Sequence, residues 1–415
     1  MSTAPTRPSD RSTDRPFDMI LFGATGFTGR LVAEYLLARF GDQGQTLRWA
    51  MAGRNLPKLE ALRSELGAAH TLPLIEADAG DAGAMTQLVA RARVVITTVG
   101  PYQRHGEALV MACARAGTDY VDLCGEPAWM AKMIPLLQGP AADSGARIVF
   151  SCGFDSVPFD LGVLYLQHAA TQLTGAPLAQ VHGRVKVMKG GMSGGTLASA
   201  LATIEAMGKD PALARTMANP FALTPGFSGP PQPAGDDAAY DELAGAWTGP
   251  FVMAPINTKN VHRTNALRGH PWGTQFVYDE RMLSRDESRA RSLARQSKLQ
   301  TRLLGIGPVR GLMQRFLLPK PGQGPNQHQR ETGRYEVLFM GRTADGRKLT
   351  AKVTGDRDPG YGSTCKMISE SALCLLQDVD QRMTPGGVWT AGAAMGLTLV
   401  KRLEAHAGLT FSMVD

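Results

Sequence analysis

The sequence predicts an α/β fold in which a doubly wound parallel sheet is followed by a second, α+β domain. A chain of 415 residues is too long for one ordinary core, so two domains are expected. From Asp18 to Gly153, candidate strands alternate with helical stretches, which is typical of a parallel sheet. Beyond Gly153 this alternation ends. The candidate strands of the sheet are residues 18–23, 47–53, 71–77, 93–99, 119–123 and 146–152.

The N-terminus and the cysteines exclude several classes of protein. Residues 1–17 are rich in Ser, Thr, Pro, Arg and Asp and lack an apolar stretch, so we expect a disordered arm rather than a signal peptide. Five cysteines without a C-x-x-C pair argue against a disulfide framework, and no metal site is expected. No run of about 18 apolar residues is present. These features indicate a cytoplasmic protein, with a peripheral membrane contact left open.

A glycine-rich turn, residues 23–29, follows the first strand and opens a helix with Leu31, Val32, Tyr35 and Leu36 on one face. The first glycine permits a tight turn, the second lets the backbone approach a pyrophosphate, and the third lets the helix pack close to the strand. This order predicts a dinucleotide-binding Rossmann domain over residues 18–155, although a purely structural turn would have the same glycines. The residues expected to contact the cofactor here are Gly23, Thr25, Gly26, Phe27, Thr28 and Gly29.

The end of the second strand favours NADP over NAD. NAD-binding chains carry a carboxylate there for the ribose 2′-hydroxyl, whereas this chain has Arg54, Asn55 and Lys58 and no acid before Glu60. A guanidinium can bind a 2′-phosphate through two charge-assisted hydrogen bonds. The alternative is that Arg54 is only a solvated residue at the start of a helix. Asp78, after the third strand, either meets the adenine amino group or caps the next helix.

The fourth strand runs into Gly100, Pro101 and Tyr102 at the carboxyl edge of the sheet, where ligands bind. We expect Gly100 and Pro101 to contact the cofactor. Tyr102, as a phenolic donor, and His105, as a general acid near neutral pH, are the candidate catalytic residues. Alternatively, Tyr102 packs over the cofactor and His105 caps a helix. The residues expected to line the substrate pocket are Glu126, Cys152, Phe154 and Asp155, with helix capping as an equal alternative for Asp155.

The remainder of the chain divides into an α+β domain, residues 156–357, and a C-terminal segment, residues 358–415. The C-terminal segment is expected to be helical and to pack back on the Rossmann domain. Residues 220–250, dense in Pro and Gly, cannot hold regular structure for long. The other expected elements are a helix over 156–168, a strand over 181–188, a helix over 196–207, a hairpin of 334–340 with 348–353, a helix over 363–376 and a returning tail at 387–389.

The segment 281–320 combines ten basic residues with two acidic ones and interleaved apolar residues. A basic amphipathic surface attracts an acidic partner, either anionic lipid headgroups or an acidic carrier protein bearing an acyl chain. A solvated helical face is the alternative. Nucleic acid is not expected, because no aromatic stacking platform or reader motif accompanies the charge.

Taken together, these motifs resemble the saccharopine dehydrogenase-like NAD(P)-binding oxidoreductases, especially the bacterial branch described as trans-acting enoyl reductases. The resemblance implies a Rossmann domain, an α+β domain, C-terminal helices that fold back, and hydride transfer from a nicotinamide cofactor. Saccharopine enzymes need arginines for a substrate with several carboxylates, and no such set is evident here. The matching stretches are residues 23–29, 52–55, 99–102, 105–107, 117–122, 125–127, 152–158, 358–362 and 387–390.

Three functions stay open at this point. The first is an NADPH-dependent reductase of the carbon–carbon double bond in an acyl or polyketide-type thioester, free or carrier-bound. The second is a saccharopine dehydrogenase-like C–N oxidoreductase, and the third is a non-catalytic NADP-binding scaffold associated with lipid. A homo-oligomer is compatible with all three.

Overall fold

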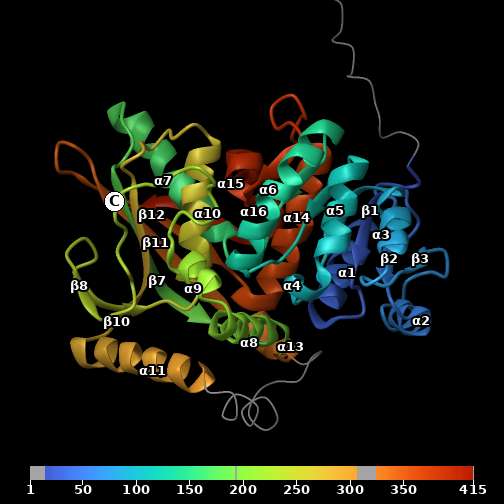
Figure 1. Ribbon diagram of the computed structural model, residues 1–415, viewed down its shortest axis with the longest axis horizontal. Helices are drawn as coiled ribbons and strands as arrows, with labels where there is room; N and C mark the ends of the chain where they lie inside the picture. The colour runs from blue at the N-terminus through green and yellow to red at the C-terminus, as the bar shows by residue number, and fades with distance from the viewer. Residues whose placement is uncertain (1–14, 192–193, 306–323, 415) are drawn as a thin grey trace, which may run out of the picture.

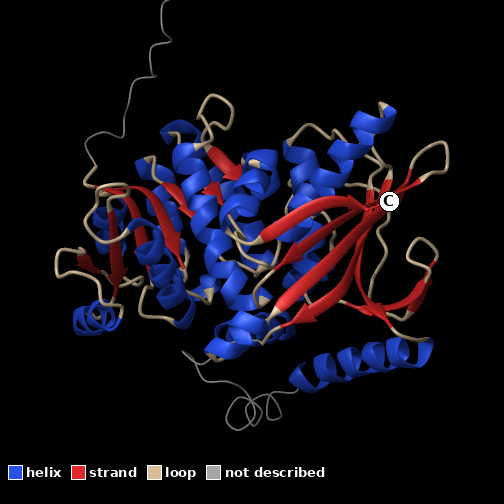
Figure 2. Cartoon of the chain, turned by 180° about the vertical axis from the view of Figure 1, so that it is seen from behind, coloured by secondary structure: helices blue, strands red, loops and turns tan. Residues whose placement is uncertain are grey.

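Two seven-stranded sheets stand at opposite ends of the molecule with a layer of helices between them (Figure 1 and Figure 2). The computed structural model describes residues 15–191, 194–305 and 324–414. Part of the predicted N-terminal arm, residues 1–14, and part of the basic segment, residues 306–320, lie outside the described residues.

The first sheet is parallel throughout, with the strand order β13-β6-β5-β4-β1-β2-β3. The chain proceeds outward from β1 in one direction through β2 and in the other through β4, which creates a crevice at the carboxyl ends of β1 and β4. The strands are β1 (Phe17–Phe22), β2 (Trp49–Gly53), β3 (Leu74–Glu76), β4 (Ala92–Thr97), β5 (Asp119–Val121), β6 (Arg147–Val149) and β13 (Gly387–Trp389).

Helices cover both faces of this sheet, which explains why its strands are apolar without alternation. Met19 and Leu21 of β1 pack on one face, and Ile20 and Phe22 pack on the other. The helices on the first face are α1 (Phe27–Phe40), α2 (Leu56–Glu65) and α14 (Thr364–Gln377), and those on the second are α3 (Ala82–Val89), α5 (Glu107–Ala116) and α6 (Pro127–Ser144).

The second sheet is mixed, with the order β14-β12-β11-β7-β10-β9-β8, and only β7 and β10 pair in parallel. The predicted hairpin is confirmed as β11 with β12. Segment 220–250 is irregular only in its first part, because β8 and β9 form a hairpin at its end. The strands are β7 (Gln180–Lys189), β8 (Ala239–Asp241), β9 (Ala246–Pro250), β10 (Val277–Ser284), β11 (Arg334–Arg342), β12 (Lys348–Gly355) and β14 (Leu409–Val414).

The helices between the sheets join both into one hydrophobic core. A single cluster of buried residues contains Met19 of the first sheet and Phe339 of the second. The central helices are α7 (Val157–Thr174), α10 (Ala254–Leu267), α15 (Ala391–Ala394) and α16 (Gly396–His406). The remaining elements are α4 (Tyr102–His105), α8 (Gly194–Lys209), α9 (Pro211–Ala218), α11 (Glu287–Gly305), α13 (Gln327–Thr332) and the π-helical turn η1 (Pro359–Ser363).

Both ends of the chain differ in part from the expectation. Helix α14 packs on α1 and on strands β4 and β5, and β13 joins the first sheet, so the predicted return to the Rossmann domain is confirmed. However, β14 extends the second sheet, so segment 358–415 is not only helical and does not pack on the Rossmann domain alone.

At the N-terminus, Arg15 donates to the Ala116 carbonyl (2.6 Å) and the Thr118 hydroxyl (2.5 Å), and Phe17 begins β1. Residues 15–17 therefore belong to the folded domain.

Candidate active site

The turn between β1 and α1 requires glycine for steric reasons. Gly23 has a positive φ of 90°, and a Cβ there would lie 2.6 Å from a methyl group of Val99. A Cβ on Gly29 would lie 2.1 Å from the carbonyl oxygen of Gly23, so α1 can approach β1 only with a glycine at this position. Gly26 precedes α1, whose first turn has no acidic side chain. The unpaired N–H groups of this helix end form a site for an anion.

The end of β2 lies beside this turn, since a Cβ on Gly53 would be 3.9 Å from the Thr25 hydroxyl. Arg54 and Lys58 are exposed there, and in the described part of the chain neither pairs with a carboxylate. The Asn55 side chain caps α2 by accepting from the Lys58 backbone N–H (2.9 Å). Two cations thus lie at the carboxyl end of β2, and Asn55 caps the helix that carries one of them.

Asp78 does not cap the next helix. Its carboxylate accepts from the Gly80 backbone N–H (2.8 Å), and Asp81 caps α3 instead. The capping alternative for Asp78 is therefore wrong. The exposed Asp78 closes a turn at the carboxyl edge of the sheet, and its contact with adenine stays a prediction.

Tyr102 lies beneath the loop at the end of β4, with its hydroxyl bonded to the protein. The hydroxyl donates to the Thr97 carbonyl (3.3 Å) and accepts from the Leu123 backbone N–H (3.0 Å), which ties the end of β4 to the end of β5. The ring packs against Trp129, and burial raises the pKa of Tyr102 well above its usual value. These contacts give Tyr102 a structural position, and its catalytic role and its packing over a cofactor stay predictions. His105 is exposed at the end of α4 and does not begin a helix.

The contacts of the Tyr102 hydroxyl predict how the Tyr102→Phe variant will behave. The variant is expected to keep kcat nearly unchanged but to lose about 1–2 kcal/mol of folding free energy, because the Leu123 N–H loses its acceptor in a buried place. Thermal unfolding and steady-state kinetics check the two parts separately. A large fall in kcat at unchanged stability would restore Tyr102 as a catalytic acid.

Glu126 supports the same loop. Its two carboxylate oxygens accept from the backbone N–H groups of Tyr102 and Gln103, each at 2.9 Å, and the side chain is buried. The carboxylate therefore fixes residues 100–103 at the edge of the sheet. Both oxygens are committed to the loop, so a direct contact of Glu126 with substrate is not supported.

The turn after β6 brings only one of its three predicted residues to an accessible position. Cys152 is fully buried, and the Phe154 ring packs in the core against Phe159 (5.5 Å between centroids) and Tyr335 (4.8 Å). Asp155 is only half-buried, and among the described residues its carboxylate has no hydrogen-bond or ion-pair partner. Burial raises the pKa of Asp155 to about 7. This carboxyl can therefore carry a proton near neutral pH.

Helix α10, next to Asp155, was missed by sequence reasoning. Its Asn260 donates to the Ser156 hydroxyl (2.6 Å), and Asn257 donates to the buried Glu280 (2.9 Å). Ser156 has a positive φ of 133°, so these contacts hold a strained residue beside Asp155. The amide oxygen of Asn260 is buried and has no hydrogen-bond partner among the residues that the structure describes, and burial lowers the pKa of Lys259 to about 8. The sequence signal that could have revealed this helix is a proline near its start, followed by a run that is mostly polar.

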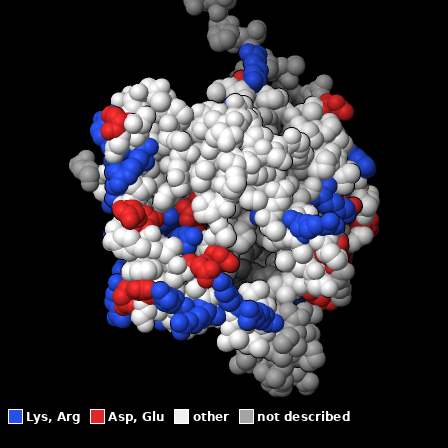
Figure 3. Space-filling model, turned by 60° about the vertical axis from the view of Figure 1, so that its left-hand side comes forward, with Lys and Arg blue, Asp and Glu red and all other residues white. Residues whose placement is uncertain are grey.

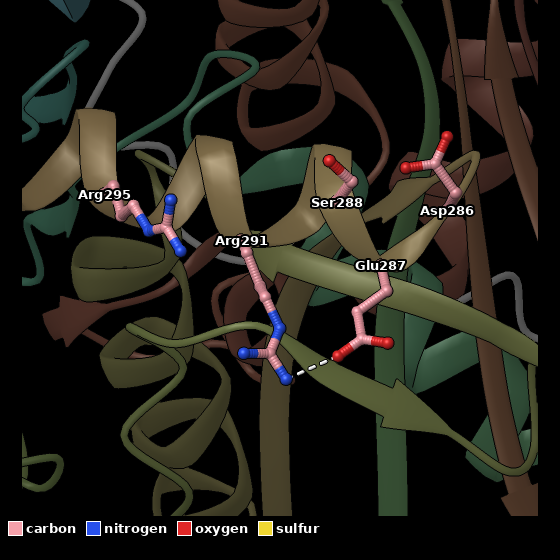
Figure 4. A pocket seen from close by; sticks show the side chains of 5 residues that line it. All are labelled: Asp286, Glu287, Ser288, Arg291 and Arg295. Atoms are coloured by element: carbon pink, nitrogen blue, oxygen red, sulfur yellow. Dashed lines mark ion pairs between the residues drawn. The ribbon is translucent and has the colours of Figure 1, made fainter.

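Several basic side chains of segment 281–320 are paired with carboxylates in the structure, so the excess of positive charge on this surface is smaller than the sequence suggests. Lys298 of α11 pairs with Asp237 (2.6 Å), Arg285 pairs with Asp286 (2.9 Å), and Arg291 pairs with Glu287. Figure 3 shows acidic side chains interspersed with the basic ones on this side of the molecule. A surface hollow of about 450 Å³ lies at the start of α11 (Figure 4). Figure 1 shows this helix at the end of the molecule opposite to strands β1, β2 and β3. The hollow is lined by Asp286, Glu287, Ser288, Arg291 and Arg295.

Two other classes of site receive no support. Within residues 15–191, 194–305 and 324–414, no group of three His, Cys, Asp or Glu side chains is placed to hold a metal ion. No helix in these ranges is long and apolar enough to cross a membrane.

Comparison with known proteins agrees with the geometry of the glycine turn. Residues 19–149 match the family model of the saccharopine dehydrogenase NADP binding domain, which confirms the predicted cofactor class. In fold, the chain is similar to a saccharopine dehydrogenase (L-Glu forming) from Saccharomyces cerevisiae, with a TM-score of 0.50, 14% identity, and coverage of 96% of this chain and 100% of that one. A homospermidine synthase from Legionella pneumophila has a TM-score of 0.52 at 9% identity, covering 97% of this chain and 92% of its own.

Much closer relatives exist in mycobacteria. A Mycobacterium tuberculosis protein, named provisionally as a trans-acting enoyl reductase, is 42% identical over 411 residues, which are 95% of this chain and 97% of that protein. A trans-acting enoyl reductase of Mycobacterium ulcerans is 39% identical over 412 residues, covering 94% and 96%. Identity at this level along nearly the whole length includes both sheets. The chain therefore belongs to the trans-acting enoyl reductase family, within the saccharopine dehydrogenase-like oxidoreductases that bind NADP.

Proposed function

We propose that this chain reduces the α,β double bond of an acyl thioester held by a polyketide synthase carrier, with NADPH as the hydride donor. The observation that carries the proposal is the near full-length identity to relatives named for that reaction and for action in trans. Because action in trans means that another protein presents the substrate, a carrier-bound thioester is the simplest substrate class.

The protein residues suited to hold the cofactor follow the carboxyl edge of the first sheet. Arg54 and Lys58 suit the 2′-phosphate, and the turn of residues 23–29 suits the pyrophosphate. Bound NADPH supplies a hydride from its nicotinamide ring. The loop of residues 100–103 follows β4 and Asp155 follows β6, so these residues would border the nicotinamide half of a dinucleotide bound across the crevice at the carboxyl edge.

Asp155 is the group we assign as the proton donor. Delivery of a hydride to the carbon β to the thioester carbonyl would move the electron pair of the double bond toward the carbonyl, and Asp155 would then donate its proton to the α carbon. The resulting carboxylate regains a proton from water. A carboxyl whose pKa is raised to about 7 by burial is protonated often enough at neutral pH to act in this way.

The polar residues of α10 support this placement. Asn260 and Asn257 hold Ser156, so the turn that carries Asp155 cannot move freely. The unpartnered amide oxygen of Asn260 is an acceptor that a substrate can satisfy. An amide-bearing thioester arm brings N–H donors of the required kind.

The competing C–N chemistry needs arginines that converge on the substrate. The three deeply buried arginines of the described chain are committed elsewhere: Arg147 pairs with Asp119, Arg184 pairs with Asp241 and Asp279, and Arg263 donates to the carbonyls of Leu223 and Val388. None of these buried arginines is free to bind a substrate with several carboxylates, which favours the enoyl thioester.

Oxidation of NADPH by the purified protein tests the proposal. We expect turnover with α,β-unsaturated thioesters, faster when the acyl group is carrier-bound than when it is free, and a saturated product in the mass spectrum. If no unsaturated thioester is turned over while a keto acid is reduced in the presence of an amine, the C–N alternative replaces the enoyl reductase proposal. NADPH binding without turnover of either class would indicate a scaffold.

A further inference from the structure

We propose that Arg330, which follows the second sheet's β10 and α11 in the chain, is a cofactor-binding residue that holds the pyrophosphate of NADP together with the glycine turn. The inference concerns cofactor binding alone. Its test therefore does not depend on the identity of the acyl substrate.

Arg330 lies directly at the start of α1. Its guanidinium carbon is 5.7 Å from the centroid of the Phe27 ring, and Phe27 is the first residue of that helix. One Nη atom donates to the Pro325 carbonyl (2.8 Å), which fixes the orientation of the guanidinium. The planar group is thus held over the helix end at which an anion binds, with further N–H groups left to donate.

Among the described residues Arg330 forms no direct ion pair, although its charge partly offsets the rise that burial gives to the pKa of the nearby Asp358. The nearby Asp358 uses its carboxylate to accept from the backbone N–H groups of Tyr361 (3.0 Å) and Gly362 (2.8 Å), and it forms no ion pair with Arg330. A half-buried guanidinium without a carboxylate partner favours an anionic ligand, because part of its hydration has already been lost.

The glycine turn lacks another cation to balance a pyrophosphate. Arg30, on the first turns of α1, is bound to Glu34 (3.1 Å) and Glu65 (2.5 Å). A helix end supplies only about half a positive charge, whereas a pyrophosphate carries about two negative charges. Arg330 is the described side chain at this turn that can supply the missing charge.

The residues around Arg330 pack closely against the start of α1. The rings of Phe27 and Tyr361 meet edge to face at 5.1 Å, and a Cβ on Gly324 would lie 2.5 Å from the Phe27 ring. A Cβ on Gly190, at the end of β7, would lie 2.7 Å from Pro359. Segments from the second half of the chain therefore pack against the glycine turn, and Arg330 is the cation among them.

Equilibrium binding without acyl substrate tests this role. Arg330→Met keeps the stem that packs on Phe27 and removes the charge. We expect it to weaken NADPH and NADH by the same factor, roughly tenfold to a hundredfold, because both contain the pyrophosphate. Binding of adenosine 2′-phosphate, which lacks a pyrophosphate, should not change. Arg330→Lys should recover part of the affinity, and Arg334→Met, an exposed arginine on the adjoining strand, should have no effect.

Two results would overturn the assignment. One is unchanged affinity of Arg330→Met for both dinucleotides at unchanged thermal stability. The other is a loss confined to NADPH, since that pattern belongs to a 2′-phosphate contact. If Arg330→Met fails to fold, Arg330→Gln decides, because glutamine removes the charge but keeps an N–H donor for the Pro325 carbonyl: an equal loss for both dinucleotides supports the assignment, and unchanged affinity for both overturns it.

Discussion

Asp155→Asn is expected to lower kcat by about 10²–10⁴-fold while the dissociation constant of NADPH stays unchanged. The asparagine keeps the shape of the side chain but cannot deliver a proton to the α carbon. In the proposed arrangement NADPH is held by the glycine turn and the end of β2, so its binding should not depend on this carboxyl. Stopped-flow hydride transfer and NADPH titration measure the two quantities on the same preparation.

The pH profile gives the same claim a second test. Burial raises the pKa of Asp155 to about 7, and the acid form is the active one, so kcat/KM should fall as pH rises through about 7. The raised folded-state pKa also means that stability from this group is full below its unfolded pKa of about 4 and is lost as pH rises toward 7. Asp155→Asn should therefore unfold at the same or a higher temperature than wild type at pH 8.

A matched control separates this effect from a general loss of charge. Asp143→Asn changes an exposed carboxylate on α6 and should leave kcat, its pH profile and the melting temperature unchanged. A normal kcat for Asp155→Asn would remove Asp155 from the mechanism. A lower melting temperature at pH 8 would mean that the carboxylate has a stabilising partner.

Arg54→Glu is expected to raise the dissociation constant of NADPH by about 100-fold without weakening NADH. The substitution removes the guanidinium at the end of β2 and places a carboxylate there, which repels the 2′-phosphate but can accept from a ribose 2′-hydroxyl. Arg54→Gln should lie between wild type and Arg54→Glu. Fluorescence titration with both dinucleotides measures the ratio, and an equal loss for both would contradict a 2′-phosphate contact at Arg54.

The first sheet could be predicted because buried parallel strands are continuous apolar runs. Residues 18–23 and 93–99 read as strands without knowledge of their neighbours, and the glycine spacing identified the turn between strand and helix. Strand β13, by contrast, is only three residues long and is specified by pairing with β6 rather than by its own pattern. Strand β14 likewise depends on the partner edge of β12.

The sheet edge that carries the candidate site could be predicted from the sequence, but the direction of its side chains could not. Tyr102 and Asp155 both follow strands of one sheet edge, and only tertiary contacts show that the first is bonded beneath a loop while the second stays open. Helix α10 was missed because a polar helix is usually exposed, whereas Asn257 and Asn260 are buried against Ser156 and Glu280. Arg330 was missed because its neighbour Phe27 is remote in the chain.

Isotope placement in the product is the most direct test of the enoyl reductase assignment. Reduction of a carrier-bound α,β-unsaturated thioester with NADPH deuterated at the transferred position should put one deuterium on the β carbon. The same reaction with ordinary NADPH in heavy water should put one on the α carbon. Deuterium from NADPH at a carbonyl or imine carbon, with the carbon–carbon double bond intact, would contradict the assignment.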